Sequence, residues 1–535
     1  MFILLSYSLY ATNLPKANLK SKRIFASFYF FAKCLYLPLT MISQSQIIKL
    51  IFGLKINQLR RKKKLTPGEL AERCGLSNSY LNEIEKGKKY PKSDKIFSMA
   101  EALNVKYDDL VSLKLGKQLE LISDLLNSHV FKEFPLEMFG IEPGKLIELI
   151  SNAPLKMNAF ISTVMEIARN YEMKQEHFYL ATLRSYQEMH DNYFEELEDA
   201  VDLFTVKFKI KAKAQLNRRH LYDILESEYG YTIDKKKLTK NKALHHFRSV
   251  FVPATKKLMI NDGLTESQKA FLLAREIAFN YLDLTERPNT TPPYKARSFE
   301  EVLANFKASY FAVALLMNRE LVIEDLRELF KSPNWDNKEF LSLMSRYEAS
   351  PEMFLHRLTN LLPRYFGIKN LFFLRFSHKS NTNVYHLTKE LHLSKLHNPH
   401  GNELNEHYCR RWVSLNIIED LKKIQKKKSM SNPIVGVQRS KYFGTENEYL
   451  CISVAKPNSP EPNSHISVTV GFLIDEHLKK KLHFLDDEDI ITRVVNETCQ
   501  RCPIEDCKER VADPVVIEHQ NRMELLESNL AELSK

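Results

Sequence analysis

The spacing of apolar and polar positions divides the chain into regions of different character. From residue 47 to about 113, short helical patterns follow one another, separated by Gly and Pro. From about 117 to 363, apolar residues recur mostly at helical spacing, with short β-branched or aromatic runs near 249–260. After Gly367 the pattern changes to predicted strands joined by polar loops, at 371–376, 384–387, 449–454 and 466–473. We therefore predict a multidomain, mainly α-helical protein.

These patterns give segment boundaries. We expect a five-helix domain at 45–115, a helical core at 116–363, an α+β domain with a small antiparallel sheet at 364–515, and an exposed amphipathic helix at 516–535. Residues 1–44 stay unassigned. Their apolar run at 24–42 resembles a marginal membrane span, but we interpret it as translated upstream sequence before a natural start at Met41, and expect no membrane association.

Charge and cysteine usage narrow the function. The 535 residues carry a net charge of +12, and the segment from Lys55 to Lys95 alone holds twelve Lys/Arg against five Asp/Glu. Such a local excess favours an anionic partner. Seven cysteines, an odd number, argue against a secreted disulfide framework and favour a reducing, cytoplasmic compartment.

The basic segment has the local signals of two short helices joined by a tight turn. Thr66 can cap a helix that begins at Pro67, Gly75 suits a turn with positive φ, and Ser77 can cap the next helix. Leu70, Ala71 and Cys74 then form one buried face, and Tyr80, Leu81 and Ile84 the other. The outward residues of the second helix are Asn78, Ser79 and Asn82.

Those outward positions are the ones a recognition helix presents to base edges in the major groove of double-stranded DNA. Phosphate contacts would come from the surrounding cations, Arg60, Arg61, Lys62, Lys63, Lys64, Lys86, Lys88 and Lys89. The segment resembles the Cro/C1-type (XRE) helix-turn-helix family, except that Pro67-Gly68 replaces the usual Gln-Glu, which puts one phosphate contact in doubt. One such unit reads only a half-site of an operator, so we expect a homodimer.

Residues 157–318 resemble the ImmA/IrrE-type peptidase-like domain, through the runs that begin at Phe271 and Phe311. The resemblance implies a His-Glu-x-x-His zinc motif, but Arg275 and Phe279 stand at the histidine positions, and Lys307 at the later acidic ligand. Only Glu276 remains, so we predict no enzyme activity. Arg275 and Lys307 suit an anion pocket, or are ordinary surface or salt-bridged residues.

Three cysteines near the C-terminus, Cys499, Cys502 and Cys507, have C-x2-C-x4-C spacing. Nearby arginine and lysine residues favour the thiolate forms that bind metal. We expect a [4Fe-4S] cluster, with zinc or unligated thiols as alternatives. A fourth ligand would come from Cys409, from Cys451 or from outside the chain.

The C-terminal half resembles the short-chain fatty acyl regulators. The resemblance rests on the run from Leu361 to Ile368, the run from Asn405 to Trp412, and the three cysteines. It implies a transcriptional regulator that senses an acyl-CoA-type metabolite. The alternatives are a metallopeptidase that cleaves a repressor partner and a redox-sensing iron–sulfur regulator.

Overall fold

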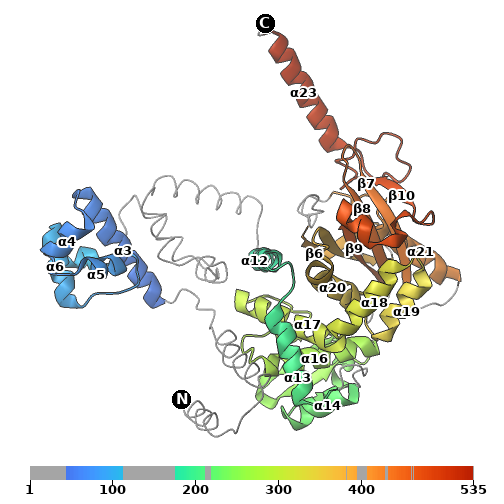
Figure 1. The fold of residues 1–535 in the computed structure, drawn as a ribbon, viewed down its shortest axis with the longest axis horizontal. Helices are drawn as coiled ribbons and strands as arrows, with labels where there is room; N and C mark the ends of the chain where they lie inside the picture. The colour runs from blue at the N-terminus through green and yellow to red at the C-terminus, as the bar shows by residue number, and fades with distance from the viewer. Residues whose placement is uncertain are drawn as a thin grey trace. The chain divides into compact units, whose positions relative to one another are not determined.

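The computed structural model describes residues 44–112, 175–210, 218–241, 243–380, 382–393, 406–427, 432–458, 461 and 463–533 (Figure 1). The chain forms two compact units, one of residues 1–182 with 297–300 and one of 183–296 with 301–535. The predictions for residues 1–43 and for the first part of the helical core lie outside the described residues.

The described part of the first unit contains the five helices that the sequence predicts. They are α3 (Gln44–Lys62), α4 (Pro67–Arg73), α5 (Asn78–Glu85), α6 (Ser93–Leu103) and α7 (Tyr107–Val111). Their apolar faces meet in one core, in which Ile56, Leu70, Leu81, Ile84 and Met99 are completely buried. The shared core fixes the two short helices α4 and α5, which are too short to be stable alone.

Two residues of α3 hold this helix close to its neighbours. A Cβ atom at Gly53 would lie 2.4 Å from the Ile84 carbonyl oxygen, so glycine permits close contact between α3 and the end of α5. The buried Lys55 ammonium donates to the carbonyl oxygens of Asp109 (2.7 Å) and Ser112 (2.5 Å) at the end of α7. Lys55 therefore stabilises the fold of the domain and does not contribute to its positively charged surface.

Residues 175–366 are mainly helical, as predicted, and include a small sheet. The helices are α12 (Gln175–Met189), α13 (Glu195–Lys207), α14 (Arg218–Ser227), α15 (Lys237–Lys240), α16 (Glu266–Tyr281), α17 (Phe299–Leu316), α18 (Arg319–Lys331), α19 (Asn337–Arg346), α20 (Pro351–Leu361) and the π-helix η3 (Leu362–Phe366). The strands are β1 (Thr232–Asp234), β2 (Ser249–Val252), β3 (Lys257–Ile260) and β4 (Thr290–Thr291), in the order β1-β3-β2-β4. Strands β2 and β3 are the β-rich runs that the sequence shows near 249–260.

The C-terminal part is built on a six-stranded sheet of order β10-β7-β8-β9-β5-β6 (Figure 1). Its strands are β5 (Leu371–Lys379), β6 (Tyr385–His392), β7 (Ile434–Tyr442), β8 (Glu448–Pro457), β9 (Ser464–Leu473) and β10 (Thr492–Val495), and its helices are α21 (Val413–Lys427), α22 (Glu476–Lys481) and α23 (Val515–Leu533). The predicted small antiparallel sheet is corrected in two ways. First, the sheet has two further strands, β7 and β10, that the sequence did not predict. Second, these two strands pair in parallel, so the sheet is mixed and not purely antiparallel.

The two faces of this sheet are buried against different helices. Helix α21 packs on one face, and helices α19 and α20 pack on the other. One continuous apolar cluster joins residues of α18 to α20 with residues of β5, β8 and β9. A buried ion pair lies nearby in the same unit, with the Arg357 Nη2 atom 2.9 Å from the Glu198 carboxylate. The expected boundary between residues 363 and 364 therefore falls inside one packed body.

None of the helices in the described part of the chain combines the length and the apolar character that crossing a membrane requires.

Candidate functional sites

The helix-turn-helix segment has the capping geometry that its sequence predicts. The Thr66 hydroxyl accepts from the Glu69 amide at 3.2 Å, while the Glu69 carboxylate accepts from the Thr66 amide at 2.7 Å. This reciprocal capping box begins α4. Gly75 has a φ of +61° in the turn, and the Ser77 hydroxyl accepts from the Tyr80 amide at 3.2 Å. The local signals therefore place α5 as predicted.

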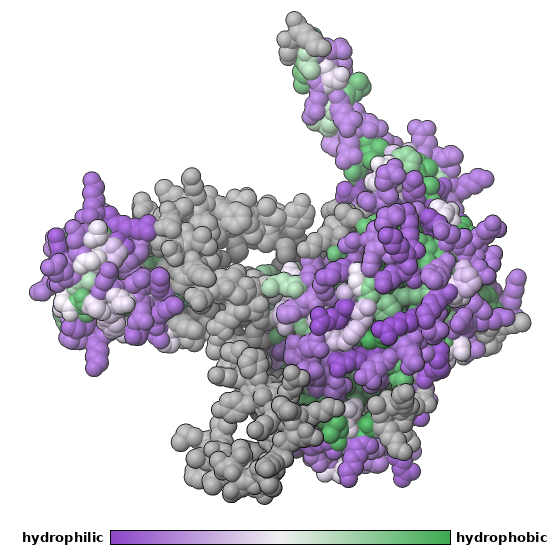
Figure 2. Space-filling view, in the orientation of Figure 1, coloured by the Kyte–Doolittle hydropathy of each residue, from purple (hydrophilic) through white to green (hydrophobic). Residues whose placement is uncertain are grey.

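Helix α5 presents three polar side chains to solvent. Asn78, Ser79 and Asn82 are all exposed, whereas Leu81 and Ile84 on the opposite face are completely buried. Within the described residues, the three polar side chains make no hydrogen bond that would have to break before they contact a base. The side of the helix-turn-helix unit that faces the viewer in Figure 2 is mostly hydrophilic. This is the arrangement of a DNA-recognition helix.

The cations assigned to DNA phosphates separate into two groups. Arg61, Lys62, Lys63, Lys64, Lys88 and Lys89 are exposed, and Lys86 is half-buried. Arg60 is buried, and its guanidinium donates to the Glu85 carboxylate at 2.6 and 2.9 Å and to the Leu65 carbonyl at 2.8 Å. The prediction of a phosphate contact is therefore wrong for Arg60, because it joins α3 to the end of α5 inside the domain.

At the peptidase-like site, Arg287 contacts two residues of the motif, Glu276 and Phe279. The buried Glu276 carboxylate accepts from the Arg287 guanidinium at 2.5 Å and from the Tyr231 hydroxyl at 3.3 Å. The Arg287 guanidinium also stacks 4.0 Å from the Phe279 ring centre and 4.3 Å from that of Phe251. An internal cation therefore already neutralises the one acidic side chain that remains from the zinc motif.

The structure does not bring Arg275 and Lys307 to one centre. The buried Arg275 guanidinium donates to the Asn305 side chain at 3.2 Å and to the Thr291 hydroxyl, and burial lowers its pKa to about 10. Lys307 lies two positions after Asn305 on α17, roughly 200° further around the helix. Burial lowers the pKa of Lys307, and the nearby Glu196 carboxylate partly opposes that change. The two cations therefore have different surroundings, which does not support the predicted shared pocket.

A denser group of cations surrounds Glu352, and the sequence reasoning did not find it. The Glu352 carboxylate lies 2.5 Å from the Lys389 ammonium and 3.1 Å from the Arg375 guanidinium. Burial alone would raise the pKa of Glu352, but Lys389, Arg375 and Arg248 hold it well below its ordinary value. Burial lowers the pKa of Lys456 to about 8, and Arg248 and Arg375 add to that effect.

We call Arg248, Arg375, Lys389 and Lys456 around Glu352 the Glu352 cluster. It holds four cations and one central carboxylate, and the Glu461 carboxylate also acts on Arg248. The Arg248 guanidinium and the Lys456 ammonium form neither a hydrogen bond nor an ion pair with any described residue. Because its members are spread from residue 248 to residue 456, no local sequence pattern predicts the cluster. Its excess of partly buried positive charge favours an anionic ligand.

The chain brings Cys409 next to the C-terminal cysteines. The Cys409 amide donates to the Glu497 carbonyl at 3.0 Å, and the Cys499 amide donates to the His407 carbonyl at 2.8 Å. Burial, together with the proximity of Cys502 and Cys499, raises the pKa of the Cys409 thiol to about 11. Three of these thiols, Cys409, Cys499 and Cys502, are buried, and that of Cys507 is half-buried.

Arg510 fixes the backbone of the cysteine segment. Its guanidinium donates to the carbonyl oxygens of Cys499 (3.0 Å), Cys502 (3.0 Å) and Ile504 (2.5 Å). The four-thiol donor set has the right chemistry for zinc or an iron–sulfur cluster. In the part of the chain that the structure describes, however, no three Cys, His, Asp or Glu side chains lie in an arrangement that could hold a metal ion. The metal site therefore stays a prediction.

Cys451, the other predicted candidate for a fourth ligand, has different surroundings. It lies in β8, where its thiol contacts the Tyr449 carbonyl at 3.9 Å, and burial raises its pKa to about 12. Cys499 and Cys502 raise the pKa of Cys409 but do not influence the pKa of Cys451.

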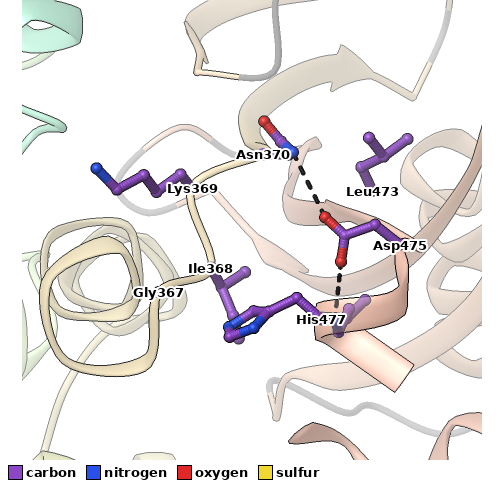
Figure 3. Close-up of a pocket in the computed structure, with 8 residues that line it drawn as sticks. Gly367, Ile368, Lys369, Asn370, Leu473, Asp475 and His477 are labelled. Atoms are coloured by element: carbon purple, nitrogen blue, oxygen red, sulfur yellow. Dashed lines mark hydrogen bonds between the residues drawn. The ribbon is translucent and has the colours of Figure 1, made fainter. Parts of the chain in front are cut away.

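A cavity of about 230 Å³ lies between the start of β5 and helix α22 (Figure 3). Its polar groups are occupied by local structure. The Asp475 carboxylate caps α22 by accepting from the Leu478 amide at 2.8 Å, and the His477 ring lies 2.8 Å from the Phe366 carbonyl. Lys369 points away from the cavity in Figure 3 and pairs with Asp191 at 2.6 Å. We assign no ligand to this cavity.

Comparisons with known proteins agree with the two N-terminal resemblances. Residues 56–110 match the helix-turn-helix family, and residues 227–359 match the IrrE N-terminal-like domain family. The first segment is a Cro/C1-type helix-turn-helix domain. The second match includes α16, β2, β3 and the Glu276–Arg287 pair.

Several whole proteins are similar to parts of this chain. The HTH-type transcriptional regulator RamB of Mycobacterium tuberculosis (strain H37Rv) is 23% identical over 336 residues, which cover 58% of this chain and 65% of RamB. The control protein C.BamHI of Bacillus amyloliquefaciens is 35% identical over 65 residues, covering 12% of this chain and 80% of that protein. A solved structure titled Mycobacterium tuberculosis transcriptional regulator aligns with 62% of this chain and 92% of its own, with 17% identity and a TM-score of 0.44.

Proposed function

We propose that the protein is a sequence-specific, DNA-binding transcriptional regulator that acts as a dimer in the cytoplasm. The observation that carries this proposal is the exposed polar face of α5, formed by Asn78, Ser79 and Asn82 and bordered by exposed lysines. Similarity to RamB and to C.BamHI supports it. A single helix-turn-helix contacts one half-site, so a pair of copies is needed for tight operator binding.

Selection from random DNA duplexes would identify the operator, and substitutions would then test the recognition helix. We expect Asn78→Ala and Asn82→Ala each to weaken specific binding by roughly 1–3 kcal/mol without affecting non-specific binding. Lys62→Ala and Lys88→Ala should instead weaken binding to all sequences alike and reduce the salt dependence. If all four variants behaved alike, α5 would not be the recognition helix.

We further propose that the regulator responds to an anionic metabolite of the acyl-CoA type. The Glu352 cluster supports this, because CoA carries phosphate groups and two cations of the cluster form no hydrogen bond or ion pair with a described residue. Arg275 and Lys307 support it less, since they have separate surroundings.

Calorimetric titration with CoA, with short-chain acyl-CoA and with inorganic phosphate would test the ligand. Lys456→Ala and Arg248→Ala should weaken binding of the first two, whereas Lys423→Ala should not, because Lys423 is exposed and pairs with Asp420 at 3.0 Å. Binding that is unchanged in both cluster variants would place the ligand elsewhere. Equal affinity for all three probes would indicate a simple phosphate site.

We also propose that Cys409, Cys499, Cys502 and Cys507 bind a [4Fe-4S] cluster, with zinc as the competing metal. The convergence of Cys409 on Cys499 and Cys502 supports Cys409 as the fourth ligand. When bound, such a cluster can respond to oxidation, which is the basis of the redox-sensing alternative. The chain would supply the thiolates and, through Arg510, a fixed backbone around them.

Iron, sulfide and zinc analysis of anaerobically purified protein would test the metal site. Replacing any of the four cysteines by Ser should remove most of the metal, because a neutral hydroxyl cannot match a thiolate. Cys74→Ser should keep it, since Cys74 lies in the core of the helix-turn-helix domain, and Cys451→Ser should keep it, since neither Cys499 nor Cys502 influences the pKa of Cys451. If the protein contains zinc and no iron, the site is a zinc site and not an iron–sulfur cluster. If it contains neither metal, the four cysteines are free thiols and the proposed metal site is wrong.

The metallopeptidase alternative receives no support from the geometry of α16. Arg275 and Phe279 offer no lone pair to zinc at the motif positions, and Arg287 already pairs with Glu276. We therefore propose that the IrrE-like segment serves as a structural and sensing element.

A further inference from the structure

Helix α23 ends the described chain as a helix with no buried residue (Figure 1). Every residue from 518 to 533 is exposed. Among them are large apolar side chains, with exposed fractions of 43% at Met523, 49% at Leu526 and 85% at Leu533. Figure 2 shows apolar surface along this helix between hydrophilic patches. Exposed apolar side chains in such number on one helix indicate a surface that binds another protein.

The apolar residues follow a coiled-coil repeat. Positions 516, 519, 523, 526, 530 and 533 alternate in steps of three and four, and all except His519 are apolar. This spacing places them on one stripe, the a and d positions of a heptad. Val516, Met523 and Leu530 take position a, and Leu526 and Leu533 take position d. The adjacent Leu525 takes position c, off the stripe.

The charges beside the stripe identify the partner. Arg522 takes position g and Glu527 takes position e of the following heptad. In a parallel pair of identical helices, each g residue faces the partner's e residue five positions later. Arg522 of each copy would therefore face Glu527 of the other, which gives two opposite-charge pairs. In an antiparallel pair, g residues face g residues and e residues face e residues, so Arg522 would no longer face Glu527 and both opposite-charge pairs would be lost.

We propose that α23 pairs with α23 of a second copy of this chain in a parallel, two-stranded coiled coil. The seam covers two and a half heptads, which is short for a coiled coil that forms alone. A pair of copies held on one operator has a high effective concentration of the two helices. This inference rests in part on the proposed dimeric DNA binding, and it assigns a defined surface to the dimer.

The oligomeric state of the full chain, measured by sedimentation alone and with operator DNA, tests the seam. Leu526→Glu should weaken dimerisation at least about tenfold, because the two copies would bury carboxylates against each other in the seam. Leu525→Glu is the matched control, since it makes the same change one residue away, at an outward position, and should leave the dimer intact. Equal effects of both variants, or a wild-type chain that stays monomeric both alone and with operator DNA, would overturn the proposal.

A charge exchange distinguishes a second copy from an unrelated partner. Arg522→Glu and Glu527→Arg should each weaken the dimer, and the double variant should regain most of the lost affinity, because only a self-pairing helix restores both contacts. Oxidation of Leu526→Cys should link two copies, and oxidation of Leu525→Cys should not. A double variant as weak as the single ones would exclude the parallel pair.

Operator binding separates the failure of this inference from the failure of the proposed function. If Leu526→Glu binds the operator as tightly and as a dimer, α23 is not the dimer surface, although DNA binding stands. If the wild-type chain dimerises through α23 but binds no DNA sequence selectively, the coiled coil stands and the regulatory proposal fails.

Discussion

Helices α4 and α16 begin in the same way, but the polar motif residues that follow are exposed in one case and buried in the other. Each starts with a capping box, formed by Thr66 with Glu69 in α4 and by Thr265 with Gln268 in α16. Helix α5, which follows α4, exposes Asn78, Ser79 and Asn82. Helix α16 instead buries Arg275, Glu276 and Phe279 at the positions that correspond to the zinc motif.

The comparison shows that a motif is informative about function only when its polar groups stay available. The amides of α5 keep their hydrogen-bonding capacity for a ligand. In α16 that capacity is used inside the fold, because Arg287 pairs with Glu276 and Asn305 accepts from Arg275.

Loss of the internal cation should have the largest effect. Arg287→Ala leaves the buried Glu276 carboxylate without its charged partner and should lower the free energy of unfolding of its unit by about 3–5 kcal/mol. Denaturant unfolding of the full chain would measure it. Arg364→Ala is the control, because Arg364 pairs with Glu195 on the surface and should contribute at most about 1 kcal/mol. A small effect of Arg287→Ala would show that Glu276 is held in another way.

Substitution of the adjacent residues Arg60 and Arg61 should affect different properties of the helix-turn-helix domain, stability in one case and DNA binding in the other. Arg60→Ala removes the buried pair with Glu85 and should destabilise the domain by about 2–3 kcal/mol. Arg61→Ala should leave stability unchanged and instead reduce the salt dependence of DNA binding, since Arg61 is exposed. Thermal unfolding and binding at several salt concentrations would separate the two effects. The reverse result would restore Arg60 as a phosphate contact.

The two capping boxes should give the smallest effects and differ only in their pH dependence. Thr66→Ala and Thr265→Ala should each lower local stability by about 1 kcal/mol, measured by amide hydrogen exchange at the helix starts. The hydrogen bond from the Thr66 amide lowers the pKa of Glu69, so this stabilisation is present above the ordinary value of 4.5 and is lost as the pH falls through the folded value. Gln268 does not titrate, so acidification should weaken the α4 box alone. Equal acid sensitivity of both boxes would contradict this.

The sequence by itself determined the features that depend on neighbours along the chain. Thr66, Gly75 and Ser77 act through hydrogen bonds and backbone angles within a few residues, so they located α4 and α5 correctly. The apolar spacing of residues 517–533 likewise predicted the exposed helix that the structure shows as α23. The prediction that Arg275 and Phe279 offer no lone pair to zinc likewise needs only the chemistry of each side chain.

Only the tertiary structure decided which charged side chains are available. Arg60 and Arg61 are indistinguishable in sequence, and packing of α3 on α5 turns one of them towards Glu85. Three other features join residues that lie eleven to more than two hundred positions apart in the sequence. They are the pairing of Arg287 with Glu276, the Glu352 cluster, and the approach of Cys409 to Cys499 and Cys502. Strand β10 was missed for the same reason, since its parallel partner β7 lies about fifty residues earlier. Contacts over such distances depend on how whole elements pack, and no local pattern encodes them.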